Sequence, residues 1–170
     1  NVPSDLLAAL KAEAYGVDLT SDENRFNGNL AGNIESEYKL SKNKDALEEY
    51  VLTLCEQYRN NWDMRHTSKP LAVESLELQS YWVNFQKKHE FNPMHTHDGL
   101  YSFAIWLKVP YTITSELAQP MSQRTNMPRP GMFCFIYTNI FGEVREAEFP
   151  VDNSYEGTIS VSYTHLTLPT

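Results

Sequence analysis

The chain has 170 residues, of which 41% are hydrophobic, and its 14 basic and 22 acidic residues give a net charge of -8. This length suits one domain with one core, and the negative charge excludes a protein that binds nucleic acid by neutralising phosphates. No segment reaches the roughly 18 to 20 consecutive apolar residues of a bilayer crossing, and no signal peptide is recognisable. We therefore expect a soluble, cytoplasmic protein without a membrane partner.

The two ends of the chain carry separate information. The sequence begins at Asn1 instead of Met, which is typical of a fragment or a processed start. The segment 162–170 resembles the translated adaptor sequence found at the ends of fragmentary metagenomic reads. We therefore expect a single domain over residues 1–160 and a non-native tail over residues 161–170.

Two apolar patterns in the first half of the chain predict helices. A cap at Ser4 or Asp5, apolar residues after it and Gly16 at the end are typical of a short opening helix. In the segment 44–58, apolar residues recur at offsets of three and four, which predicts a second helix with one apolar stripe. The polar stretch 20–42 predicts a loop with no more than a short strand or turn.

After residue 70 the apolar residues alternate with polar neighbours, and this period of two predicts half-buried strands. The predicted strands lie within 76–85, 103–109, 132–140 and 143–151, and the last two flank a Phe-Gly turn that predicts a hairpin. Residues 112–130 predict a polar loop. Helices followed by antiparallel strands predict a mainly β fold, a double-stranded β-helix (jelly-roll) with N-terminal helices.

The segment richest in chemically active side chains contains His95, His97 and Asp98, between two predicted strands. We expect His95 and His97 on one strand of the jelly-roll, where side chains two positions apart point to the same face, so both imidazoles can reach one metal ion at about 2 Å. Neutral imidazole suits Fe(II), zinc, copper or nickel and disfavours magnesium or calcium. From the spacing alone, the alternative that the two histidines only form local hydrogen bonds stays open.

Two kinds of metal site use a His-x-His pair on a β-barrel. A cupin site has a glutamate three to four residues after the second histidine, and Leu100 and Tyr101 occupy those positions, which disfavours a cupin. The other kind is the facial triad of non-haem iron oxygenases, in which His-x-Asp or a variant supplies two ligands and a later strand supplies a distal histidine.

The two cysteines and the other histidines give weaker indications of a functional site. Cys55 and Cys134 lie far apart without a CxxC spacing, so we expect small buried hydrophobic side chains instead of a zinc knuckle or a disulfide. His66 and His89 have charged neighbours and are expected at the surface. No phosphate-binding glycine loop, GxSxG elbow or kinase motif is present.

The segments around the histidine pair form a wider pattern, to which other parts of the chain contribute. They are Trp82–Gln86, Glu90–His97, Tyr101–Tyr111, Asn29–Ile34 with Glu37 and Tyr38, and Tyr155–Gly157. Together they resemble a family of 2-oxoglutarate-Fe(II) oxygenases common in marine phages and bacteria, over most of residues 3–158. The resemblance implies a dioxygenase (hydroxylase) that acts on an unknown substrate with Fe(II) and 2-oxoglutarate, in the host cytoplasm if phage-encoded.

The resemblance implies roles for individual residues. His95 takes the position of the first metal ligand, and His97 stands where many relatives have a carboxylate. Asp98 is the alternative second ligand, one residue beyond the His-x-Asp spacing. Asn84 lies upstream of the pair and is a candidate cosubstrate contact, although an ordinary polar strand face also explains it.

The resemblance also implies a distal histidine and an arginine that binds the far carboxylate of 2-oxoglutarate. Neither is recognisable, because His165 is out of register and no arginine follows Arg145. We therefore expect a jelly-roll that lacks its last strands and a catalytically incomplete chain. The alternative function is a non-catalytic jelly-roll, either a binding module or a phage structural or accessory protein. The sequence determines neither the substrate nor the oligomeric state.

Overall fold

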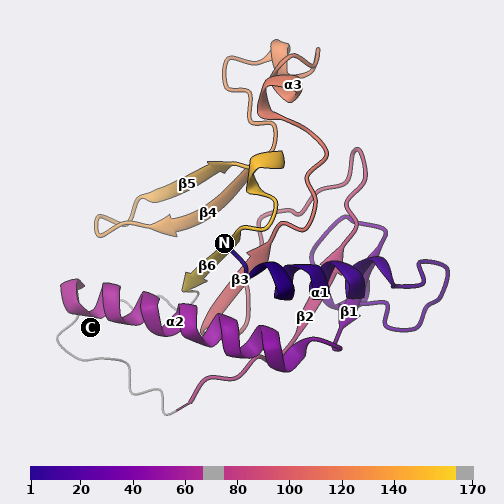
Figure 1. The fold of residues 1–170 in the computed structure, drawn as a ribbon. Helices are drawn as coiled ribbons and strands as arrows, with labels where there is room; N and C mark the ends of the chain where they lie inside the picture. Colours follow the sequence, from indigo (N-terminus) through magenta and orange to yellow (C-terminus); the bar gives the residue numbers. More distant parts are fainter. Residues whose placement is uncertain (67–74, 164–170) are drawn as a thin grey trace. The chain divides into compact units, whose positions relative to one another are not determined.

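The structure is a computed structural model that describes residues 1–66 and 75–163 (Figure 1). The helices are α1 (Ser4–Tyr15), α2 (Lys44–His66) and α3 (Ile113–Leu117). The strands are β1 (Glu37–Leu40), β2 (Tyr81–Asn84), β3 (Tyr101–Ile105), β4 (Met132–Thr138), β5 (Val144–Pro150) and β6 (Ile159–Tyr163). Short 3-10 helices lie at Asn27–Asn29, Ser122–Arg124 and Asn153–Tyr155.

The chain divides into two compact units, which we describe separately. The N-terminal unit comprises Val2–Ala104 together with Ser160–Thr170, and the hairpin unit comprises Asn1 and Ile105–Ile159. The described strands pair two by two: β1 with β2, β3 with β6 and β4 with β5, of which the first and last pairs are antiparallel. Antiparallel strands and N-terminal helices are therefore present in a mixed fold, and no closed barrel is formed among the described residues.

Both predicted helices of the N-terminal unit are confirmed, with one difference at the first cap. The N-cap of α1 is Pro3, which makes no side-chain capping bond, so the prediction of Ser4 or Asp5 as the cap is wrong. Proline fixes φ near the helical value and has no N–H to satisfy, so it can precede a helix without a capping side chain. In α2, Leu47, Val51 and Cys55 are buried at offsets of four, as the stripe predicted.

The predicted strands occur, but two of them have different limits. β2 begins only at Tyr81, because the N–H of the preceding Leu78 donates to the Glu48 carboxylate (3.2 Å) instead of to a neighbouring strand. β3 ends at Ile105, and the N–H of Val109 donates to the Glu156 carboxylate (2.9 Å). At both places a glutamate side chain accepts the backbone N–H that a neighbouring strand would otherwise have bound.

The hairpin of β4 and β5 is confirmed, and its register runs from Met132 opposite Pro150 to Thr138 opposite Val144. Its turn is fixed by the Asn139 side chain, whose Oδ1 accepts from the N–H groups of Phe141 and Glu143 at 2.9 and 3.0 Å. Gly142 has φ +78°, a conformation that favours glycine. The predicted loop 112–130 also contains α3, which begins with a Thr112–Ser115 capping box.

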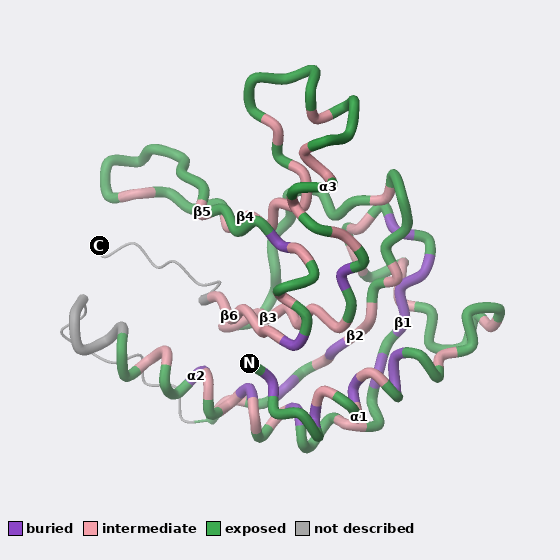
Figure 2. The backbone as a smooth tube through the Cα atoms, turned by 45° about the horizontal axis from the view of Figure 1, so that its top comes forward, coloured by how far each residue is buried: buried purple, intermediate pink, exposed green. Residues whose placement is uncertain are grey.

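The core of the N-terminal unit follows α1, β1, α2 and β2, where the buried positions gather (Figure 2). Its centre contains a charged side chain, Glu13, which is only 6% exposed. The Glu13 carboxylate accepts from the backbone N–H groups of Ser41 (2.7 Å) and Lys42 (2.6 Å) and from the Tyr81 hydroxyl (2.9 Å). Asn43 adds its side-chain amide at 2.8 Å. One carboxylate thus joins α1, the turn before α2, and β2.

The hydrogen bonds decide the charge state of Glu13. Burial by itself raises the pKa of the Glu13 carboxyl, but the donors from Lys42, Asn43, Ser41 and Tyr81 together hold this pKa below its ordinary value. Glu13 is therefore ionised at neutral pH, and its donors are satisfied. Burial and the neighbouring Glu13 carboxylate raise the pKa of Tyr81, which keeps the phenol protonated as a donor.

Replacing Glu13→Gln keeps the shape of the side chain but sets an NH2 group against buried N–H donors. We expect a loss of roughly 2–4 kcal/mol in the free energy of unfolding at neutral pH, because several donors lose their acceptor. Urea unfolding followed by circular dichroism measures this loss. Glu56→Gln, an exposed change on α2, is the control and should stay within about 0.5 kcal/mol.

The difference in stability between the native chain and Glu13→Gln should also depend on pH. A depressed folded pKa contributes stability that is present above the unfolded value and is lost as pH falls through the folded value. The stability difference between the native chain and Glu13→Gln should therefore shrink as pH falls below about 4. A difference that stays constant down to pH 3 would contradict the ionised state of Glu13.

Candidate functional site

His95 and His97 lie in the loop between β2 and β3, which we call the histidine loop (residues 85–100). The prediction that the two histidines lie on one strand is therefore wrong. Pro93 has no N–H to donate to a neighbouring strand, and Gly99 has φ +90°, which no strand residue adopts. Both histidine side chains are exposed.

The two imidazoles nevertheless lie together. Their ring centroids are 4.6 Å apart and the ring planes meet at 63° in an edge-to-face arrangement. Two imidazoles that bind one ion in neighbouring positions at about 2.0–2.1 Å place their centroids roughly 4.5 Å apart. The observed spacing therefore fits a pair of ligands to a common ion.

The tautomer of His95 is set by a backbone group. Its Nδ1 lies 2.8 Å from the carbonyl oxygen of Pro93, an acceptor, so Nδ1 carries the proton and donates. In the neutral imidazole the other nitrogen, Nε2, then carries the lone pair that can bind a metal ion. A backbone carbonyl that fixes the non-ligating nitrogen is the usual arrangement around metal-binding histidines.

His97 is held in its neutral form. Protein atoms that displace water from its ring lower the pKa of His97, and charge on His95 lowers this pKa further, whereas Asp98 opposes the effect. A neutral imidazole is the form that binds a metal ion. The lowered pKa therefore favours the form of His97 that can bind a metal ion.

Among the described residues, the remaining predicted site residues do not complete a group of three metal ligands with the pair. Within residues 1–66 and 75–163, no group of three metal-ligating side chains includes His95, His97 or Asp98. Asp98 is exposed in the histidine loop, and Asn84 is exposed at the end of β2, opposite Glu37 of β1.

The chain has three further histidines, His66, His89 and His165. His89 is exposed, as predicted, with φ +72°. The side chain of His66 and all of His165 lie outside the described residues.

The first part of the histidine loop is tied to the segment that precedes β1. The N–H of Asn33 donates to the carbonyl of Phe91 at 2.9 Å, and the N–H of Glu35 donates to the Glu90 carboxylate at 3.0 Å. Lys87 forms an ion pair with Glu35. These contacts fix the loop just before the histidines.

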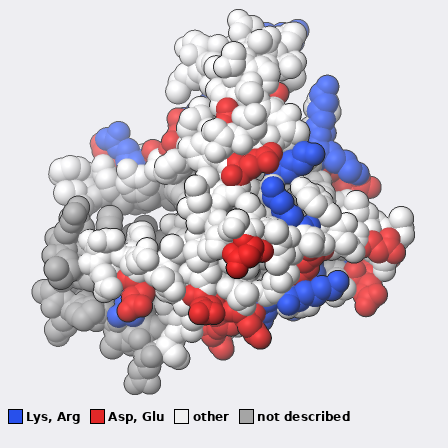
Figure 3. All heavy atoms as spheres, in the orientation of Figure 1, with Lys and Arg blue, Asp and Glu red and all other residues white. Residues whose placement is uncertain are grey.

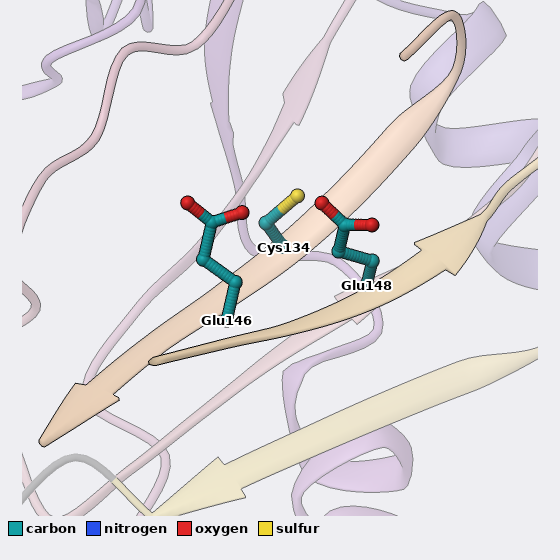
Figure 4. Close-up of side chains that lie close together, drawn as sticks. All are labelled: Cys134, Glu146 and Glu148. Carbon is teal, nitrogen blue, oxygen red and sulfur yellow. The ribbon is translucent and has the colours of Figure 1, made fainter. Parts of the chain in front are cut away.

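A second cluster of donor atoms lies in the hairpin unit and was missed by the sequence analysis. Cys134 of β4 and Glu146 and Glu148 of β5 present a thiol and two carboxylates within 4.8 Å of one another, on one face of the hairpin (Figure 4). Cys134 lies directly opposite Glu148, and Glu146 is two positions away on the same face. The alternation of acids along β5 was the available signal, but the register that brings Cys134 to them is tertiary.

Arg129 already forms ion pairs with both carboxylates of this second cluster. Its Nη1 lies 2.7 Å from the Glu146 carboxylate, and its Nη2 lies 2.6 Å from the Glu148 carboxylate. Burial raises the pKa of the Cys134 thiol, and the two carboxylates raise it further. A protonated thiol is a poor ligand, so the cluster is an ion-paired patch. The prediction of a buried Cys55 is confirmed, whereas Cys134 is only partly buried.

Charge and hydropathy give no further site. On the face shown in Figure 3, Lys and Arg side chains lie beside Asp and Glu side chains instead of forming a broad basic patch. None of the described helices combines the length and the apolarity that a membrane-spanning segment needs.

Comparisons of the chain with models of protein families, with curated proteins and with solved structures find no match. The function must therefore be argued from the geometry of the site.

Replacing Arg129→Gln leaves Glu146 and Glu148 unpaired beside Cys134. We expect the thiol of Cys134 to react more slowly with iodoacetamide at pH 8, because the removed guanidinium favoured the thiolate. The free energy of unfolding should fall by no more than about 1 kcal/mol, since the pairs are partly solvated. The rate is measured by mass spectrometry of the Cys134 peptide.

Arg145→Gln is the matched control, because Arg145 pairs with Glu143 near the hairpin turn. It should leave the rate at Cys134 within about a factor of two of the native rate. Equal slowing by both variants would mean that the effect is general to the hairpin and not due to the cluster.

Proposed function

We propose that this chain is an Fe(II)- and 2-oxoglutarate-dependent dioxygenase that hydroxylates a small-molecule or protein side-chain substrate. The observation that carries the proposal is the pair of imidazoles at 4.6 Å, one of them with its Nδ1 held by a backbone carbonyl. The resemblance of the surrounding segments to a 2-oxoglutarate oxygenase family supports it.

The fold and the location belong to the same proposal. We propose that the antiparallel pairs β1–β2 and β4–β5 are parts of a jelly-roll preceded by helices. We place the enzyme in the cytoplasm, or in the host cytoplasm if a phage encodes it.

The proposed roles follow from the donors at hand. His95 binds the iron through Nε2 and His97 is the second ligand, with Asp98 as the alternative carboxylate donor. Asn84 is proposed to hydrogen-bond 2-oxoglutarate. Because the described residues bring no third side-chain donor to the pair, the proposal assigns two protein ligands only. Fe(II) and 2-oxoglutarate, when bound, would supply the activation of dioxygen that hydroxylation needs.

What the chain itself supplies is orientation and charge state. The Pro93 carbonyl accepts from Nδ1 of His95, so in the neutral imidazole Nε2 is the nitrogen that can bind a metal ion. The lowered pKa of His97 favours its neutral ring. Imidazole donors favour iron over magnesium or calcium, which prefer oxygen ligands.

Anaerobic titration with Fe(II), with and without 2-oxoglutarate, tests the proposal. We expect Fe(II) binding to the native chain, a weak visible charge-transfer band when 2-oxoglutarate is added, and a loss of affinity of at least about tenfold in His95→Ala and in His97→Ala. Isothermal calorimetry measures the affinity and absorbance measures the band.

Two control variants make the titration specific. His89→Asn removes an exposed histidine of the same loop, and asparagine tolerates the positive φ at that position. Cys134→Ser removes the thiol of the other cluster. Both should bind Fe(II) like the native chain. Unchanged affinity in His95→Ala would refute the assignment of His95.

The non-catalytic alternative is decided by the same titration. Iron binding at His95 and His97 that 2-oxoglutarate leaves unchanged, with no charge-transfer band, would indicate a binding or structural module that holds a metal without catalysis.

A further inference from the structure

Glu37, at the start of β1, has a fully buried side chain with 0% exposure. Its Oε2 accepts from the Asn27 side-chain amide at 3.3 Å. Its Oε1 is the buried side-chain atom that finds no hydrogen-bond partner among the described residues. A buried ionised carboxylate with an unused oxygen costs several kcal/mol, so this side chain is unlike Glu13, whose oxygens are all used.

The unpaired oxygen lies near a second acceptor, beside Gly32. A Cβ placed on Gly32 would lie 2.7 Å from Glu37 Oε1 and 2.6 Å from Asn92 Oδ1, so both oxygens reach the same small space beside the Gly32 backbone. Two acceptors with no donor between them repel each other. One proton on Glu37 removes the conflict, because a neutral carboxylic acid is itself a donor.

The charges around Glu37 also favour the neutral acid. Burial raises the pKa of the Glu37 carboxyl, and the negative charge of Glu90 in the histidine loop raises it further. The neighbouring cations are engaged elsewhere: Lys87 pairs with Glu35, and Arg25 pairs with Asp22 and donates to the Glu35 carbonyl at 2.8 Å.

We propose that Glu37 is a protonated carboxylic acid whose Oε1–H donates to Asn92 Oδ1, and that this hydrogen bond is a latch that holds the histidine loop against β1. Glu37 is then a positioning residue for the histidine pair. The latch stands on the geometry of Glu37, Gly32 and Asn92 alone, and its effect on metal binding rests on the proposed function.

The position of Asn92 in the loop explains why the latch matters. Asn92 follows Phe91, whose carbonyl is bound by the Asn33 N–H, and precedes Pro93, whose carbonyl faces Nδ1 of His95. Holding Asn92 therefore restrains the backbone immediately before Pro93, whose carbonyl accepts from Nδ1 of His95. Gly32 is required beside the latch, since any larger residue would fill the space that the two oxygens use.

The latch is sensitive to pH in one direction. A folded pKa raised above the unfolded value contributes stability that is present below the unfolded value and is lost as pH rises through the folded one. Ionised Glu37 would again oppose Asn92 Oδ1 with an acceptor. The histidine loop should therefore be held at low pH and released as Glu37 loses its proton.

The test uses the metal-free chain, with hydrogen exchange of the Asn33 and Glu35 amides, which donate to the loop, and a carbon NMR titration of the Glu37 carboxyl. In the native chain we expect the Glu37 carboxyl to titrate above the ordinary glutamate value of 4.5. The protection of both amides, corrected for the intrinsic pH dependence of exchange, should fall as Glu37 loses its proton. Glu37→Gln keeps a neutral donor and should keep protection at every pH. Asn92→Ala should lose at least about tenfold of the protection at low pH and show no pH step.

The control is Glu23→Gln, the same chemical change at an exposed residue ahead of β1, which should behave like the native chain. Circular dichroism shows whether each variant is folded. A Glu37 carboxyl that titrates at or below its ordinary value, or a Glu37→Gln chain that loses protection as Asn92→Ala does, would overturn the latch.

The Fe(II) affinities of the same variants separate this proposal from the proposed function. At neutral pH, Asn92→Ala should bind Fe(II) about tenfold more weakly than Glu37→Gln. If the exchange results hold and no variant binds Fe(II), the latch stands and the proposed function fails. If Fe(II) binds to His95 and His97 but Asn92→Ala leaves amide protection unchanged, the latch fails and the proposed function stands.

Discussion

The Glu13 carboxylate is the contact on which the N-terminal unit depends. It gathers donors from the turn before α2 and from Tyr81 of β2, which are 28 to 68 residues away along the chain. These donors are buried, and without a charged acceptor each would be left unpaired in the core. The position of β2, and therefore the start of the histidine loop, follows from this one ionised group.

Glu13 and Glu37 show how the same side chain takes opposite roles in one core. Four residues donate to Glu13, so the ionised form is the stable one although the residue is buried. Glu37 has one long hydrogen bond and an unused oxygen, so burial favours the neutral form. The number of donors that the fold supplies, and not burial alone, separates a structural anion from a proton-carrying acid.

The histidine pair owes its geometry to local and distant contacts together. The approach of the two rings and the bond from His95 to the Pro93 carbonyl arise within five residues of chain, 93–97. The loop that carries them is held by Asn33 and Glu35, from the segment before β1. A pair of exposed imidazoles can keep a fixed spacing only if the backbone beneath them is anchored in this way.

The sequence by itself determined the elements whose cause is local. The apolar stripe of α2 follows from a period of 3.6, and the β4–β5 hairpin from alternation around the Asn139–Gly142 turn, and both need only neighbouring residues. The His-x-His spacing likewise predicted that the two imidazoles lie together, whereas its placement on a strand ignored what Pro93 and Gly99 do to the backbone. Only the tertiary structure decided that Tyr81 meets Glu13, that Cys134 faces Glu146 and Glu148, and that Glu37 is left with an unpaired oxygen beside Asn92. Each of these contacts joins residues far apart in the chain, and their strength depends on burial and on strand register, which no local pattern encodes.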